Sequence, residues 1–213
     1  MGVMAAWAPS EAIRLKAGTW DGAPALCSCA SAAIFDGSSG TVAAAGIEIT
    51  PFGGDIIDGT YRVGVWRHSE VEIAAPTTKY TGEPLLGSAK GLYFTADQGL
   101  WENGARRLSI FAQGGWGEAD RSAVSRYFGG GLTFSSPFTG RPDDVLGIGV
   151  AYAEVGELER GEGLAGSETV VEIFYKVRVL GWMTLNPDIQ WVHRPGGSDH
   201  TALVAGLRVA TVF

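Results

Sequence analysis

Hydrophobic and polar residues alternate along much of the chain. From Glu168 to Val179, every second residue beginning at Thr169 is apolar, aromatic or β-branched, and the residues that alternate with them are mostly charged. A period of two places the two sets on opposite faces of a β-strand. The run Met183–Trp191 repeats the pattern after the short link Leu180–Gly181, so the two runs predict a β-hairpin.

Runs of this kind predict eleven strands and no amphipathic helix, so the fold class is all-β. The predicted strands are Gly2–Ala8, Ala12–Trp20, Val42–Thr50, Tyr61–His68, Gly91–Leu100, Arg107–Trp116, Arg126–Ser135, Asp144–Glu154, Glu168–Val179, Met183–Trp191 and His200–Phe213.

The links between these strands alternate in length. The short links are Pro9–Glu11, Pro51–Gly59, Glu102–Arg106, Ser136–Asp143 and Leu180–Gly181, and the long ones are Asp21–Thr41, Ser69–Lys90, Gly117–Ser125, Val155–Ser167 and His193–Asp199. Short turns at one rim and long loops at the other are typical of a transmembrane β-barrel.

Aromatic residues fall near the predicted strand ends, as expected of the girdles that mark membrane interfaces. They are Trp20, Trp101, Trp116, Trp182, Trp191 and Phe213. A soluble β-sandwich would also bury one face of alternating strands, so periodicity alone leaves both architectures open.

Composition narrows the function classes. Hydrophobic residues make up 46% of the 213 residues and charged residues 18%, which excludes a disordered chain. Charged or glycine residues interrupt every apolar run, so no transmembrane helix is expected. The net charge of −7 argues against a nucleic-acid partner. Cys27 and Cys29 and the three histidines lack metal-ligand spacing, so we assign no metal and no cofactor.

Several motifs resemble the carboxyl-terminal part of the carbohydrate-selective porins, the OprB family of outer-membrane proteins. The resemblance covers about Ala12 to Phe213, and Ala23–Gly40 is its weakest part. The motifs are TYRVGVWRHS at Thr60–Ser69, KGLYFTADQGLW at Lys90–Trp101, RPDDVLGIGVAYAE at Arg141–Glu154, the spacing of Glu168, Glu172 and Tyr175, NPDIQWVHRPGG at Asn186–Gly197 and GLRVATVF at Gly206–Phe213.

The resemblance implies a sixteen-stranded antiparallel barrel in the outer membrane of a Gram-negative bacterium, with passive diffusion of sugars such as glucose and no enzymatic reaction. It also implies contact with outer-membrane lipid and recognition of Phe213 by the barrel assembly machinery, and it leaves open a homotrimer. Residues 1–213 hold about ten or eleven of those strands. We therefore expect them to be the carboxyl-terminal portion of one barrel domain, with a signal peptide lost along with the amino-terminal part.

Alternation assigns a set of polar side chains to the inner face of such a barrel. The candidates for lining the channel and contacting sugar are Arg62, Trp66, Arg107, Glu168, Glu172, Lys176, Arg178, Asn186, Asp188, Gln190 and Arg208, and Arg14, Lys16, Glu48 and Gln113 share the face. Each charged residue could instead form a salt bridge that only braces the wall. The Trp66 ring could stack on sugar or belong to a girdle.

Three alternatives to a sugar channel are a soluble sugar-binding β-sandwich, a porin fragment that does not conduct, and a glycoside hydrolase. The hydrolase would need Glu168 and Glu172 as its acid and base. Four residues apart on a strand, they are separated by about 13 Å, which exceeds the roughly 9.5 Å limit for an inverting pair. We therefore predict that the chain is not an enzyme and has no catalytic residue. Arg141, Asp143 and Asp144 fall in a predicted turn and are interpreted as turn residues.

Overall fold

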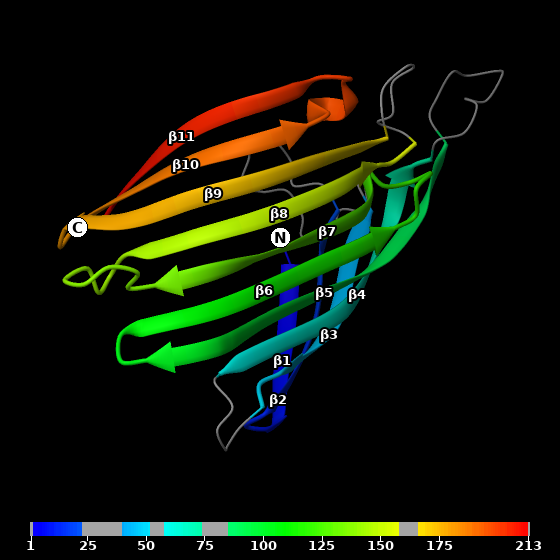
Figure 1. Ribbon diagram of the computed structural model, residues 1–213. Helices are drawn as coiled ribbons and strands as arrows, with labels where there is room; N and C mark the ends of the chain where they lie inside the picture. The colour runs from blue at the N-terminus through cyan, green and yellow to red at the C-terminus, as the bar shows by residue number, and fades with distance from the viewer. Residues whose placement is uncertain (1, 23–39, 52–57, 74–84, 158–165, 213) are drawn as a thin grey trace.

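The chain folds into one antiparallel sheet of eleven strands, shown in the computed structural model of Figure 1. The structure describes residues 2–22, 40–51, 58–73, 85–157 and 166–212, so Cys27, Cys29 and Phe213 lie outside the described residues. No described helix is long and apolar enough to cross a membrane. The strands are β1 (Gly2–Ser10), β2 (Ile13–Asp21), β3 (Thr41–Ile49), β4 (Gly59–Glu72), β5 (Leu86–Asn103), β6 (Arg106–Gly117), β7 (Val124–Ser135), β8 (Val145–Val155), β9 (Ser167–Leu180), β10 (Met183–His193) and β11 (Thr201–Thr211), with a short 3₁₀ turn, η1 (Pro195–Gly197), before β11.

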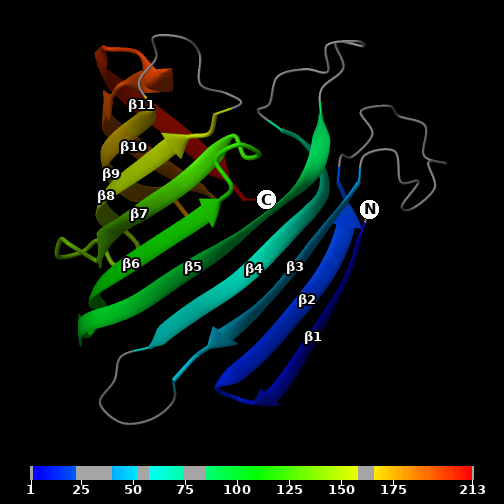
Figure 2. The same cartoon turned by 90° about the vertical axis from the view of Figure 1, so that its right-hand side faces the viewer.

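Each strand pairs with its sequence neighbours, and the order across the sheet runs from β1 to β11. All eleven predicted strands are therefore confirmed. Figure 2 shows that the sheet is a single curved layer, with β1 and β11 as its two free edges. The strands form an open curved wall, and within the described residues this wall does not close into a ring.

The two faces of the wall differ in exposure. On β4, Val63 and Val65 are 51% and 58% exposed, whereas Arg62 and Trp66, which point to the other face, are half-buried. Among the described residues, the buried apolar side chains are only Ala89 and Val192. The large apolar side chains thus cover the outer face instead of filling a core, which is the opposite of a soluble fold.

This arrangement excludes the β-sandwich. A sandwich packs two sheets face to face over a shared apolar core, but the described strands form one sheet and its apolar face is uncovered. The alternation therefore predicted the strands correctly. The apolar face of the sheet is its outer face.

The links depart from a strict alternation of short and long. One end of the sheet, here called the short-link rim, carries 11–12, 50–58, 104–105, 136–144 and 181–182, and the opposite end is the long-link rim. On the long-link rim, the links 118–123 and 194–200 are shorter than the links 50–58 and 136–144 on the short-link rim, so the prediction fails for these four links. Strands β4 and β5 also extend beyond their predicted ends toward the long-link rim, past a register shift between His68 and Val71.

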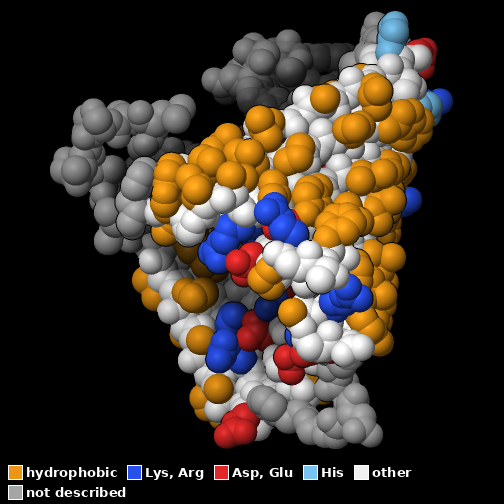
Figure 3. All heavy atoms as spheres, turned by 60° about the vertical axis from the view of Figure 1, so that its left-hand side comes forward, with side chains coloured by type: hydrophobic (Ala, Val, Ile, Leu, Met, Phe, Trp, Pro, Cys, Tyr) orange, Lys and Arg blue, Asp and Glu red, His pale blue; other side chains and the backbone are white. Residues whose placement is uncertain are grey.

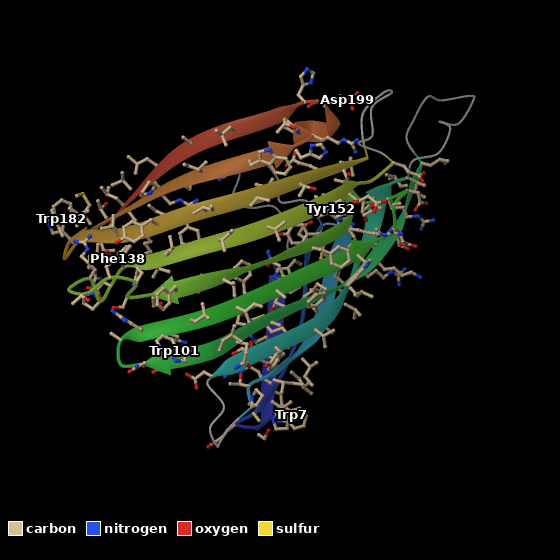
Figure 4. The ribbon with its side chains drawn as sticks, viewed as in Figure 1. Trp7, Trp101, Phe138, Tyr152, Trp182 and Asp199 are labelled. Atoms are coloured by element: carbon tan, nitrogen blue, oxygen red, sulfur yellow. The ribbon has the colours of Figure 1, made fainter. Side chains whose placement is uncertain are left out.

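Aromatic side chains gather near both rims, and most lie on the outer face. Figure 4 shows Trp101, Phe138 and Trp182 near the short-link rim and Tyr152 toward the other rim. The Trp116 ring packs edge-on against Phe128 on the outer face, with centroids 5.0 Å apart. Two girdles of aromatic residues are what a membrane-spanning wall requires.

Trp20 is an exception to the predicted girdle. It pairs with Gly2 and lies on the same face as Arg14 and Lys16, which is the inner face. Its ring lies over Gly18, where an added Cβ would come within 2.6 Å of the ring. The girdle prediction for Trp20 was wrong because position near a strand end does not decide which face a side chain occupies.

The turn between β7 and β8 is held by a buried carboxylate, Asp144, whose side chain is 2% exposed. Arg141 Nε donates to Asp144 Oδ2 at 2.7 Å, the Tyr175 hydroxyl donates to the same oxygen, and the Arg178 backbone N–H donates to Oδ1 at 3.2 Å. Burial disfavours the charged carboxylate, but these hydrogen bonds outweigh it and lower the pKa of Asp144 below its ordinary value. Asp144 therefore ties the turn to β9.

We expect Asp144→Asn to lower the urea midpoint of the folded protein at pH 7. A carboxyl group with a lowered pKa in the folded state stabilises that state above its unfolded pKa, and the effect is lost as pH falls through the folded pKa. The gap between wild type and variant should therefore shrink below about pH 4. Asp143 provides the matched control, because its side chain is 55% exposed and, among the described residues, it pairs only with Arg178. Equal midpoints for Asp144→Asn and Asp143→Asn would contradict the role of Asp144.

The adjacent residues Ile189 and Gln190 test which face of the wall meets lipid. Ile189 is 58% exposed on the outer face of β10, and Gln190 lies on the inner face opposite Glu172. We expect Ile189→Arg to lower the free energy of unfolding in lipid vesicles by about 2–4 kcal/mol, because the charge enters hydrocarbon. Gln190→Arg should have a much smaller effect. A larger loss for Gln190→Arg would reverse the assignment of the faces.

Candidate functional site: the inner wall

The predicted site residues all lie on one face of the sheet. Directly paired residues of antiparallel strands point to the same side, and the register joins Arg14 to Glu48, Glu48 to Arg62, Arg62 to Thr95 and Thr95 to Gln113. The same reasoning places Trp66 of β4 and Arg107 of β6 on this face. Across β7–β11 it adds Glu168, Glu172, Lys176, Arg178, Asn186, Asp188, Gln190 and Arg208. We call this face the inner wall.

Glu48 is the centre of a charged cluster on β2–β4. Its carboxylate accepts hydrogen bonds from Arg14 Nη1 at 3.2 Å, Lys16 Nζ at 3.0 Å and Arg62 Nε at 2.8 Å. The Glu48 side chain is 13% exposed, whereas its three cationic partners remain 41–54% exposed. One shielded carboxylate thus holds three cationic groups in place on the inner wall.

The cluster continues onto β5 through the guanidinium of Arg62. Its Nη1 donates to Asp97 Oδ2 at 3.3 Å and to Thr95 Oγ1 at 3.5 Å. Asp97 did not appear among the predicted residues, although alternation from Thr95 would have found it. Figure 3 shows cationic and anionic side chains close together in one area of the surface, with hydrophobic side chains around them.

Arg107 belongs to a separate group nearer the short-link rim. Its Nη1 lies 3.7 Å from Asp58 Oδ2 and 3.6 Å from Glu102 Oε2, and its Nε donates to Ser109 Oγ at 3.3 Å. These partners restrain the guanidinium, so Arg107 is not brought together with the cluster around Glu48.

On β9 and β10 the predicted residues divide between the rims and the middle of the wall. Glu168 accepts a hydrogen bond from the Gly196 backbone N–H at 2.7 Å, which ties β9 to the link before β11. Arg178 pairs with Asp143 in the β7–β8 turn at 3.2 Å. Between them, Gln190 Nε2 donates to Asp188 Oδ1 at 3.1 Å. Glu168 and Arg178 therefore brace opposite rims.

The remaining polar candidates lack partners in the described part of the chain. Glu172, Lys176 and Arg208 form no hydrogen bond or ion pair with any described residue. The Oδ1 atom of Asn186 is buried and has no hydrogen-bond partner there. The side chains of Glu172, Lys176 and Arg208 are not buried and are therefore available to a solute, whereas Asn186 Oδ1 is not.

Trp66 lies against the sheet on the inner wall. Its ring covers Gly91, where an added Cβ would come within 2.6 Å of it, and it reaches to 3.4 Å from the corresponding position of Gly117. The two glycines leave the space that the ring occupies. This position separates Trp66 from the outer aromatic girdles.

Aromatic residues on the middle of the inner wall were missed by the sequence analysis. Phe111, Tyr127 and Phe174 line a hollow across β6–β9 together with Gln113 and Glu172. Phe111 is two residues from Gln113, so alternation places it on the same face. It is absent from the predicted set because, apart from Trp66, alternation was used there to select polar side chains.

The inner wall offers hydrogen-bond donors and acceptors of both charges. Among the described residues, no group of three or more His, Cys, Asp or Glu side chains could hold a metal ion. A single curved antiparallel layer with an apolar outer face, aromatic rims and a charged inner face is the construction of a transmembrane β-barrel wall. The fold and the site thus define a porin-type channel wall.

A comparison with known protein families shows which family of porins the chain belongs to. The family described as carbohydrate-selective porin, OprB family, matches residues 1–213, and the chain belongs to this family. This confirms the resemblance found in the sequence motifs. Porin B of Pseudomonas aeruginosa is 28% identical over 194 aligned residues, which cover 76% of this chain and 42% of that protein.

Solved structures show the same fold. The high-pH structure of Pseudomonas putida OprB matches 99% of this chain and 58% of that chain with a TM-score of 0.84 and 23% identity. The low-pH structure of the same protein matches 99% and 54% with a TM-score of 0.66 and 20% identity. The chain thus spans about half the length of these relatives.

The cluster around Glu48 predicts an effect on ion selectivity. Glu48→Gln leaves Arg14, Lys16 and Arg62 without their shared carboxylate, so the local potential becomes more positive. For the complete barrel that contains this wall, we expect the reversal potential in a potassium chloride gradient across planar bilayers to shift toward chloride selectivity. Glu154→Gln removes the same charge from the outer face, where Glu154 pairs with Arg126 at 3.5 Å, and should cause no shift. Equal shifts would contradict an inner position for Glu48.

Proposed function

We propose that the chain forms the carboxyl-terminal part of the wall of an outer-membrane channel for passive diffusion of carbohydrates such as glucose. Membership of the carbohydrate-selective porin family supports the substrate class. The observation that carries the proposal is the inner wall itself, on which Glu48 and Asp97 are paired with Arg14, Lys16 and Arg62.

A sugar is uncharged, and each hydroxyl group both donates and accepts hydrogen bonds. A channel that favours sugars therefore benefits from donors and acceptors side by side, whereas a ring of one charge favours ions. The cluster around Glu48 has this mixed character, because guanidinium and ammonium donors lie within 3.3 Å of carboxylate acceptors. Sugar hydroxyls can exchange with these contacts as the solute passes.

The two free edges support the proposal that residues 1–213 are one portion of a larger barrel domain. Unpaired backbone groups at an edge are not tolerated in lipid. With eleven antiparallel strands, β1 and β11 run in the same direction, so an antiparallel closure requires an odd number of additional strands. The sixteen strands that the resemblance to the porin family implies meet this requirement, because they add five strands to the eleven.

The proposed function also implies contacts with lipid and with other proteins. The apolar outer face and its aromatic rims fit contact with outer-membrane lipid. Phe213 lies outside the described residues, so its recognition by the assembly machinery stays a prediction. Formation of a homotrimer stays a prediction as well. Sugars cross the proposed channel by diffusion, which needs neither a cofactor nor a chemical step.

Liposome swelling and single-channel conductance test the function. We expect liposomes that contain the complete barrel, of which residues 1–213 form the carboxyl-terminal part, to swell faster in glucose than in a larger oligosaccharide. We also expect glucose to reduce the ion current of this barrel in planar bilayers. Protein-free liposomes provide the control. Equal swelling rates together with an ion current that glucose leaves unchanged would contradict sugar selectivity. A protein that folds in lipid but carries no current would support the alternative of a non-conducting fragment.

A further inference from the structure

The hollow across β6–β9 has a volume of about 190 Å³ and lies on the inner wall, apart from the cluster around Glu48. This is many times the roughly 10–15 Å³ that a cavity needs to hold one water molecule. The hollow is lined by residues from four neighbouring strands, including Phe111, Tyr127 and Phe174. It is therefore large enough for a small organic solute.

Glycines allow the aromatic rings to lie close to the sheet. The Phe111 ring comes within 2.8 Å of the position that a Cβ of Gly131 would occupy, and the Phe174 ring covers Gly147 in the same way. Both phenylalanines are half-buried because the backbone covers one side of each ring. The uncovered sides form part of the hollow.

The polar groups around the hollow retain free hydrogen-bonding capacity. Gln113 Nε2 donates to the Tyr127 hydroxyl oxygen at 2.9 Å, which leaves the Tyr127 hydroxyl proton and the Gln113 carbonyl oxygen for other partners. The Glu172 carboxylate lines the hollow and has no partner among the described residues. A few polar groups around an otherwise apolar site are typical of small-molecule binding.

We infer that this hollow binds a single pyranose ring, as a stacking site on the sugar pathway. The C–H face of a pyranose can pack against Phe111 and Phe174, and its hydroxyl groups can reach Glu172, Gln113 and Tyr127. A purely apolar solute would leave the Glu172 carboxylate desolvated without a partner, which is unfavourable. This site rests on the proposed function, and its residues would give the channel a preference for sugar rings.

Saturation-transfer NMR with glucose on the full chain in detergent micelles tests the site without depending on conduction. Phe111→Leu and Phe174→Leu keep an apolar side chain over the glycines but remove the aromatic face. We expect each to raise the Kd for glucose about two- to tenfold. Phe128→Leu is the matched control, because Phe128 lies on the outer face of β7, and it should leave the Kd unchanged.

Two further measurements keep the inference falsifiable. Ala151→Leu fills the hollow while both phenylalanines stay in place, and it should abolish glucose binding. Sorbitol, an acyclic polyol with similar hydroxyl groups but no ring, should bind more weakly than glucose. Unchanged glucose binding in Ala151→Leu and in both phenylalanine variants would overturn the site. If glucose-dependent swelling persists in that case, the channel function stands without this site. If the variants lose glucose binding as expected but neither they nor the wild type conduct, only the channel function fails.

Discussion

Backbone hydrogen bonds between neighbouring antiparallel strands are the interaction on which the rest of this structure depends. Each of the eleven strands pairs in sequence order, and among the described residues only Ala89 and Val192 are buried apolar residues. A single layer of this kind cannot be held together by an apolar core, so the ladder of backbone bonds takes that role. In lipid the ladder is stronger still, because no water competes for the backbone groups.

This constraint determines how the side chains are used. With the backbone paired within the sheet, the outer face is free to carry apolar residues for lipid and the inner face to carry charge. On β2–β4 the charge of the inner wall is compensated locally, because the Glu48 carboxylate holds Arg14, Lys16 and Arg62. Asp144 at one rim and Glu168 at the other tie turns to neighbouring strands without contributing to the middle of the wall.

The candidate site was predictable in part. Alternation on single strands was sufficient to place Arg62, Glu172 and Arg208 on one face, because the period of two is a local property of the backbone. It could not identify the partners of these residues, since pairing depends on register between strands far apart in the sequence. It also missed Phe111 and Phe174, because an apolar side chain gives no sign of whether it meets lipid or a solute.

The sequence by itself determined the all-β class, the eleven strands and the family, because hydrophobic periodicity and short motifs are encoded locally. Only the tertiary structure decided which residues meet. At Leu100 an extra residue shifts the register, so Trp101 pairs with Leu108 and turns outward to contact Phe134, whereas simple alternation from Asp97 would point it inward. Such bulges and the open curvature of the wall arise from strand pairing, and strand pairing is a property of the whole sheet.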